Sequence, residues 1–166
     1  MRVLLPLLLL GSLGGCGLRP MYAGGGSGAV AGGLGQVEVA PIEGRAGWLV
    51  ANALRDRIGV GGGGATPRYR LQIKLDDDIT GLAIRRDDSV ARERRTLRAR
   101  YQLVEIGGES VVLDATAGSD AGIDVVGSEY ATIAAESTAL ERLSETVADQ
   151  IVTRVALFVG RRPQGR

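Results

Sequence analysis

The sequence has no histidine, one cysteine and one lysine among its 166 residues. The missing histidine removes the commonest general base, the commonest metal ligand and the usual titrating group near neutral pH. A lone cysteine forms no disulfide within the chain. No apolar run approaches the roughly 20 residues that a membrane-spanning helix needs. We therefore expect no catalytic residue, no metal and no cofactor, and we predict that the protein is not an enzyme.

Neither sign of charge dominates, with 20 basic and 19 acidic side chains. One basic residue, Arg2, lies in a predicted leader, which leaves the rest of the chain balanced. Nucleic acid binding through bulk charge is therefore not expected. Lys74 is the single lysine, so nearly all cations are guanidinium groups, which hold phosphates and carboxylates through paired hydrogen bonds.

The first residues have the plan of a cleaved export signal. A positive start, Met1–Arg2, precedes the apolar run VLLPLLLL, and small residues follow it. Residues 13–16, LGGC, resemble a bacterial lipobox, so we predict cleavage of residues 1–15 and conversion of Cys16 to an N-palmitoyl, S-diacylglycerol cysteine. The alternative is an accidental cysteine beside an ordinary cleavage site. By resemblance to sorted lipoproteins, Gly17 in place of an aspartate favours the periplasmic face of the outer membrane.

The remaining chain is long enough for one domain behind a tether. Residues 16–34 are the lipidated N-terminus and a glycine-rich tether with few bulky side chains to bury. Residues 35–160 form the domain, and residues 161–166 form a basic tail. The glycines at 61–64 follow a predicted helix and lack a Gly-Lys-Ser/Thr ending, so they are expected to be a connection and not a phosphate-binding loop.

Hydrophobic periodicity predicts four strands and two helices. Alternation indicates strands over 36–42, 68–79, 91–106 and 109–117, with a glycine turn at 107–108. Apolar spacings of three and four indicate a helix over 46–58, with Trp48 and Leu54 in its stripe, and a second over 129–159, with a stripe from Ile133 to Phe158. The order βαβββα predicts an α+β two-layer sandwich. Its two helices pack on one face of a mostly antiparallel four-stranded sheet, and the other face is exposed.

The exposed face of the predicted sheet is rich in cations. By alternation, two neighbouring strands place the following side chains on it: Arg92, Arg94, Arg98, Arg100, Arg68, Arg70 and Lys74. Few anions accompany them, although Asp76 and Asp78 neutralise part of the charge, and Glu93 and Arg95 belong on the opposite face. We expect this face to bind phosphates or carboxylates of a partner. The alternative is a face that is merely solvated.

The acidic clusters are weaker candidates for a site. Asp76–Asp78 and Asp87–Asp88 have oxygen ligands for a cation, but aspartate is an ordinary turn residue and both clusters are expected to be solvated turns. Asp114, Asp120 and Asp124 lie in a stretch of small residues, expected to be a loop, without calcium-loop spacing. We assign them no role.

Several segments together resemble the LptE family of LPS-assembly lipoproteins from Gram-negative outer membranes. They are CGLRPMY at the lipidated start, YRLQIKL, the arginine-rich LRARYQLVE, the glycine turn after it, and the terminal helix that begins near EYA. The glycine-filled segment 24–35 and the GVGGGG connection depart from the family pattern.

The resemblance implies a partner and a ligand. The chain is expected to bind, plug and assist assembly of the LPS-exporting β-barrel LptD and to contact lipopolysaccharide. Cys16 would attach it to the membrane, and the Arg92 to Arg100 face would contact LPS or the barrel wall. Two rivals remain from the residues alone. One is a free-standing periplasmic lipid carrier, which needs an apolar cavity, and the other is a lipidated hydrolase, which needs two converging carboxylates.

Overall fold

The computed structural model describes residues 28–59, 66–84 and 90–161. The predicted signal peptide, Cys16, the glycines at 61–64 and Asp87–Asp88 lie outside these ranges. In chain order the elements are α2 (Ala29–Leu34), β1 (Val37–Val39), α3 (Gly44–Gly59), β2 (Tyr69–Ile84), β3 (Val90–Glu105), β4 (Val111–Asp124) and α4 (Glu129–Arg161). The predicted α+β order is confirmed, with one additional short helix at its start.

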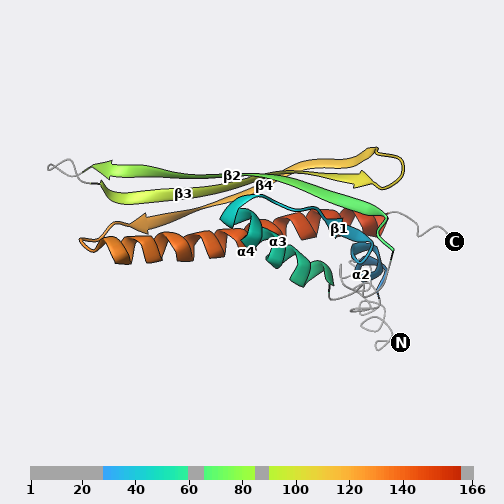
Figure 1. Cartoon of the computed structure of the whole chain (residues 1–166), viewed down its shortest axis with the longest axis horizontal. Helices are drawn as coiled ribbons and strands as arrows, with labels where there is room; N and C mark the ends of the chain where they lie inside the picture. Colours follow the sequence, from blue (N-terminus) through green and yellow to red (C-terminus); the bar gives the residue numbers. More distant parts are fainter. Residues whose placement is uncertain (1–27, 60–65, 85–89, 162–166) are drawn as a thin grey trace, which may run out of the picture.

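The four strands form one mixed sheet in the order β1-β2-β3-β4. The short β1 is parallel to β2, and the other pairs are antiparallel. The predicted turn between β3 and β4 is present, with Gly107 at φ +93°, a conformation that glycine adopts without steric cost. The sheet is long because β2 and β3 continue as a ribbon to one end of the elongated molecule (Figure 1).

Two predicted strand ends are wrong. The segment from Thr80 onwards was expected to be a polar connection, but β2 continues through it to Ile84 and pairs with β3 across two register shifts. The third long strand was expected to end at residue 117, but β4 continues to Asp124. In both cases pairing with the long β3 overrides local residue preferences, as is common for strands.

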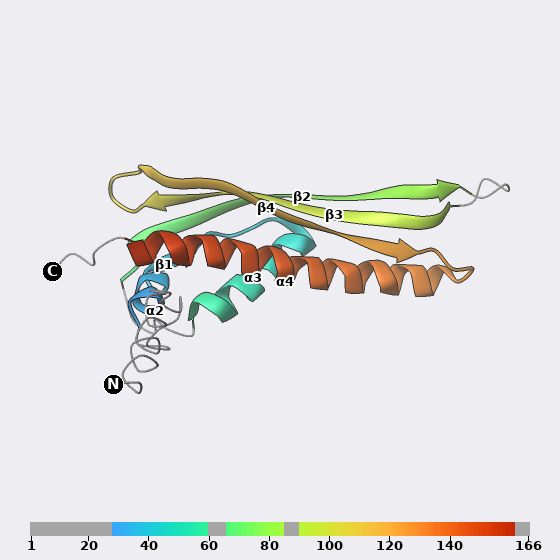
Figure 2. The same ribbon diagram turned by 180° about the vertical axis from the view of Figure 1, so that it is seen from behind.

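Helices α3 and α4 lie on the same side of the sheet, as predicted (Figures 1 and 2). Alternate strand residues such as Leu71, Leu97 and Leu103 point toward them and are fully buried with Val147 and Ile151 of α4. Helix α4 runs along β4 and β3, while α3 packs mainly against α4. None of the described helices covers the opposite face of the sheet.

Two residues of the predicted helical stripes are exposed. Trp48 is 63% exposed because the buried side of α3 is centred on Gly47, Val50 and Leu54, so Trp48 projects away from it. Ile133 is 56% exposed because its part of α4 extends beyond the start of α3 (Figure 2). The α4 stripe is buried from Ala139 onwards.

Helix α2 forms within residues expected to belong to the tether. Its Gly33 lies against Val159 near the end of α4, where a Cβ on Gly33 would be 2.9 Å from the valine side chain. Val30 approaches Gly160 in the same way. The glycines therefore allow two helices to approach closely, and the folded domain includes residues 29–34.

Candidate functional site

The face of the sheet away from the helices carries the predicted cations. Arg92, Arg94, Arg98 and Arg100 of β3 and Arg70 of β2 are exposed on it. Lys74 of β2 is exposed beside them. Glu93 and Arg95 point to the other face, as their parity predicted. The sheet therefore brings the candidate residues of two strands together on one outer surface, which we call the outer face.

The expectation of few anions on this face is wrong. The register of β4 places a row of aspartates beside the arginines of β3, either directly opposite or one pair along the ladder. Arg92 lies 3.3 Å from Asp124, Arg94 lies 3.9 Å from Asp120, and Arg100 lies 3.3 Å from Asp114. Asp114, Asp120 and Asp124 were assigned no role because they were expected to lie in a loop without calcium-loop spacing, but all three lie in β4. They balance much of the charge of β3.

The cations nearest the β3–β4 turn are also paired. Arg68 lies 3.1 Å from Glu105 and its guanidinium is 5.4 Å from the centre of the Tyr69 ring. Arg70 lies 3.5 Å from Glu38 of β1. All of these pairs are at least partly solvated, where an ion pair contributes about 0–1 kcal/mol. They set the pattern of charge on the surface more than they stabilise the fold.

Arg98 and Lys74 differ from the other five cations. Within the described part of the chain, neither has an ion-pair partner. Both line an open groove of about 690 Å³ over the middle of the sheet. The other lining residues are Leu75, Asp76, Ala99, Arg100, Thr116, Ala117, Gly118 and Gln150. This groove is the part of the outer face with the most available positive charge.

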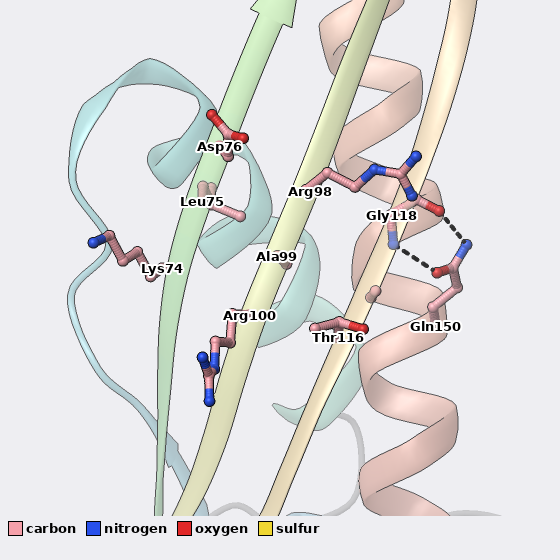
Figure 3. A pocket seen from close by; sticks show the side chains of 10 residues that line it. Lys74, Leu75, Asp76, Arg98, Ala99, Arg100, Thr116, Gly118 and Gln150 are labelled. Carbon is pink, nitrogen blue, oxygen red and sulfur yellow. Dashed lines mark hydrogen bonds between the residues drawn. The ribbon is translucent and has the colours of Figure 1, made fainter.

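Figure 3 shows how these side chains lie in the groove. Arg98 crosses from β3 toward Gly118 on β4, whereas Lys74 extends past the edge of β2. A Cβ on Gly118 would be 2.7 Å from Cδ and 2.9 Å from Nη1 of Arg98, so the glycine makes room for the arginine. Gly122 lies beneath the Arg92 guanidinium in a similar way, with a Cβ position 3.4 Å from Nε.

Gln150 of α4 closes the edge of the groove. The Gly118 N–H donates to Gln150 Oε1 at 3.0 Å, and Gln150 Nε2 donates to the Gly118 carbonyl at 3.2 Å (Figure 3). A side-chain amide thus occupies the backbone groups that an edge strand leaves open. The helix and the strand are fixed to each other where Arg98 crosses.

Electrostatic shifts on the outer face follow from hydrogen bonding. Gln102 donates to Asp114 at 2.8 Å and Arg100 donates at 3.3 Å. These two bonds, in that order, lower the pKa of the Asp114 carboxyl below its ordinary value. Asp114 is therefore an anion that holds Arg100 in place at any pH near neutrality.

Asp76–Asp78 form neither the expected turn nor a converging set of ligands. They lie within β2, where Asp77 points to the opposite face from Asp76 and Asp78. Asp77 accepts two hydrogen bonds from Arg95, at 2.8 and 2.7 Å. In the described residues there is no group of three acids or cysteines placed to hold a metal ion.

Sequence reasoning missed the link that Arg95 makes. Besides Asp77, its guanidinium donates to the backbone carbonyl of Glu136 in α4 at 3.0 Å, and the hydrogen bond to Asp77 raises the Arg95 pKa. The only signal in the sequence was that Arg95, like Glu93, is a charged residue at an inward position of a strand whose other inward positions are apolar. Arg95 joins β2, β3 and α4.

Comparisons with known proteins agree with this fold. The family model "LptE: Lipopolysaccharide-assembly" matches residues 34–155. No curated protein matches the sequence. In the part of the chain that the structure describes, no helix combines the length and the apolar character needed to cross a membrane.

Solved structures with the same architecture come from several bacteria. A crystal structure from Caulobacter crescentus has 23% identity and a TM-score of 0.67, and the match covers 82% of this chain and 99% of that one. A minor lipoprotein from Acinetobacter baumannii has 12% identity and a TM-score of 0.60, covering 79% and 96%. Rare lipoprotein B from Shewanella oneidensis has 14% identity and a TM-score of 0.52, covering 73% and 92%. At these low sequence identities, the similarity shows a shared fold alone.

Proposed function

Because the chain belongs to the LptE family of lipopolysaccharide-assembly proteins, we propose that it is an outer-membrane lipoprotein that binds and plugs an LptD-like β-barrel. In this role it assists assembly of the barrel and takes part in the insertion of lipopolysaccharide into the outer leaflet. It acts by binding, without making or breaking bonds. The solved lipoproteins with the same fold support this assignment.

The outer face suits the lumen of a barrel. The interior of an outer-membrane barrel is polar. The outer face carries paired arginines and aspartates, and no helix among the described residues covers it. Exposed ion pairs exchange partners at little cost. Such a face can therefore meet both signs of charge on a barrel wall without burying apolar surface.

Arg98 and Lys74 carry the proposal of direct contact with lipopolysaccharide. They are the two cations of the outer face without an acidic partner in the described residues, and they line its central groove. Guanidinium and ammonium groups form strong, charge-assisted hydrogen bonds with phosphate oxygens. A lipid phosphate in the groove would supply the anion that β4 supplies to Arg92, Arg94 and Arg100.

Cys16 remains the proposed lipid attachment. Residues 17–27 separate it from the folded domain, and at about 3.3–3.6 Å per residue they reach at most about 40 Å. Two or three acyl chains on one residue form a durable anchor, whereas one chain binds only marginally. The lipid would therefore hold the α2 end of the domain near the periplasmic leaflet.

Charge reversal in the groove tests the contact with lipopolysaccharide. The double variant Lys74→Glu/Arg98→Glu should weaken binding of purified LPS by about ten-fold or more, since a hydrogen bond to a charged group contributes roughly 1.5–3 kcal/mol. Co-purification with the barrel should persist. Arg92→Glu is the matched control on the same strand, outside the groove. Equal effects of both changes, or none, would show that the groove is only solvated surface.

The alternative of a free-standing lipid carrier is less well supported. A carrier needs an internal apolar cavity, but α4 packs directly on the sheet, with Val147 and Leu97 fully buried. Purification from detergent-solubilised outer membranes separates the two functions. A stoichiometric barrel partner supports the assembly role, and a monomer that carries lipid supports the carrier.

A further inference from the structure

The long strand β2 has an open edge over most of its length. β1 pairs with it only at Tyr69, Arg70 and Leu71, and the last bond of that ladder joins the Ala40 N–H to the Leu71 carbonyl at 3.0 Å. From Gln72 to Leu82 no described strand lies on that side. The other edge of the sheet is different, because α4 follows β4 and Gln150 binds both backbone groups of Gly118.

The register identifies which backbone groups this edge presents. Leu71 directs its carbonyl toward β1, so the residues that share its parity direct their N–H and C=O groups to the same side. The backbone groups of the even-numbered residues face β3 instead. Gly118 directs its N–H and C=O to Gln150, away from β3, so Arg98 opposite it directs its own backbone groups toward Asp76 of β2. Ile73, Leu75, Asp77 and Ile79 therefore present a free ladder about 20 Å long, at roughly 3.3 Å per residue.

The side chains along the edge have a definite chemistry. On the outer side, Asp76 and Asp78 are exposed, and in the described chain neither has a cation partner; Asp78 only accepts a hydrogen bond from Thr80 at 2.8 Å. On the helix side, Ile73 and Leu75 are partly buried and Ile79 is 40% exposed. Beyond Lys74, the outer side of the edge is therefore acidic, and the helix side is apolar apart from Asp77, whose charge Arg95 balances.

We propose that this edge receives a β-strand from a partner protein of the cell envelope. The strand would carry basic side chains opposite Asp76 and Asp78 and apolar side chains over Ile79. Strand addition to an open edge is a general mode of recognition, with affinity from main-chain hydrogen bonds and specificity from alternate side chains. A second copy of this chain fits poorly, because two β2 edges would bring their acidic triplets together. The proposal rests on the proposed outer-membrane location, but it does not depend on contact with lipopolysaccharide or on a barrel partner.

Amide hydrogen exchange on the full-length lipoprotein tests this proposal. In native outer-membrane vesicles, the amides of Ile73, Leu75, Asp77 and Ile79 should exchange about ten-fold or more slowly than in the detergent-purified chain. Ile79→Pro removes one outward N–H without breaking the β2–β3 ladder, and it should abolish the added protection at the other three. Ile79→Thr keeps the amide and should retain the protection.

Three results would overturn the proposal. The first is exchange that is equally fast in vesicles and in the purified chain. The second is protection that appears in the purified chain at raised concentration, which would identify a second copy as the occupant. The third is full protection in the variant Asp76→Asn/Asp78→Asn, which would remove the need for a basic strand. Circular dichroism of each variant confirms that the sheet is intact.

Discussion

At the scale of single residues, Gly118 shows how an absent side chain positions a charged one. Arg98 lies across it, and the backbone carbonyl of Leu97 is 3.1 Å from the position of a Cβ. Gly118→Ala should displace Arg98 from β4 while changing the free energy of unfolding by less than about 1 kcal/mol, because the lower entropy of the unfolded chain offsets part of the crowding. Binding of an anionic ligand in the groove should fall as it does in Arg98→Ala.

Gly122→Ala is the control for this change. Its Cβ would be 3.4 Å from the Arg92 guanidinium, an approach that needs a smaller shift. Calorimetry with a soluble phosphorylated lipid A analogue, together with thermal unfolding, measures both effects. Unchanged binding in Gly118→Ala would mean that the position of Arg98 over β4 has no bearing on the ligand.

The Asp114 carboxyl gives a prediction about pH. Its pKa in the folded state lies below the ordinary value of 3.8 because Gln102 and Arg100 donate to it. A depressed pKa contributes stability above the unfolded-state value, and that contribution is lost as the pH falls through the folded-state value. Carbon-detected NMR titration should show the Asp114 pKa rising toward 3.8 in Gln102→Leu, and rising less in Arg100→Leu. A pKa insensitive to both changes would contradict the assigned cause.

At the scale of elements, alternation identified the inner sides of two strands. Tyr69 and Leu71 in β2, and Leu97 and Tyr101 in β3, are buried as expected, because burial on one face fixes a period of two. The long helix was predicted for the same reason, from apolar residues spaced by three and four positions. The buried sides of these strands and of the helix are visible in the sequence because each is set by the apolar residues of a single element.

The end of β4 and the charge balance of the outer face were not predictable in this way. Residues 118–124, GSDAGID, contain glycine and aspartate, which are depleted in strands. They form a strand because β3 lies beside them, with Arg92 directly opposite Asp124 and Arg94 diagonal to Asp120. The alternation within the β3 segment was enough to predict that its arginines share a face. The pairing of these arginines with aspartates depends on the register between β3 and β4, which neither segment reveals alone.

Helix α2 was missed because glycine lowers helix propensity. Here the glycines serve the contact between helices, and Gly33→Val should test this. Overpacking against Val159 should cost roughly 1–3 kcal/mol if α2 stays docked, or release α2 if it does not. Limited proteolysis within residues 29–34 and thermal unfolding distinguish the two results. Gly32→Ala, one position along the same helix, is the control, and a Gly33→Val variant identical to the wild type would mean that α2 is not packed on α4.

At the scale of the whole molecule, the domain is long and its ends differ. The start of the folded chain and the end of α4 lie at one end, and the start of α4 lies at the other with the free end of the β2–β3 ribbon (Figures 1 and 2). Helix α4 has 33 residues, which is about 50 Å at 1.5 Å per residue. A lipid attached before α2 would therefore tether the α2 end of the domain more closely to the membrane than the start of α4.

The single native cysteine makes this orientation measurable. If Cys16 is acylated, its sulfur is blocked, and a cysteine introduced elsewhere is the only thiol that a maleimide dye can label. With the lipoprotein in vesicles that contain a quencher on the lipid headgroups, a dye on Arg161→Cys should be quenched more strongly than a dye on Tyr130→Cys, since both positions are exposed but lie at opposite ends of α4. A version of each with Cys16→Ser should leave the vesicles. Labelling of the unsubstituted protein would reveal a free thiol at Cys16, and equal quenching at both positions would show that the long axis lies along the membrane surface.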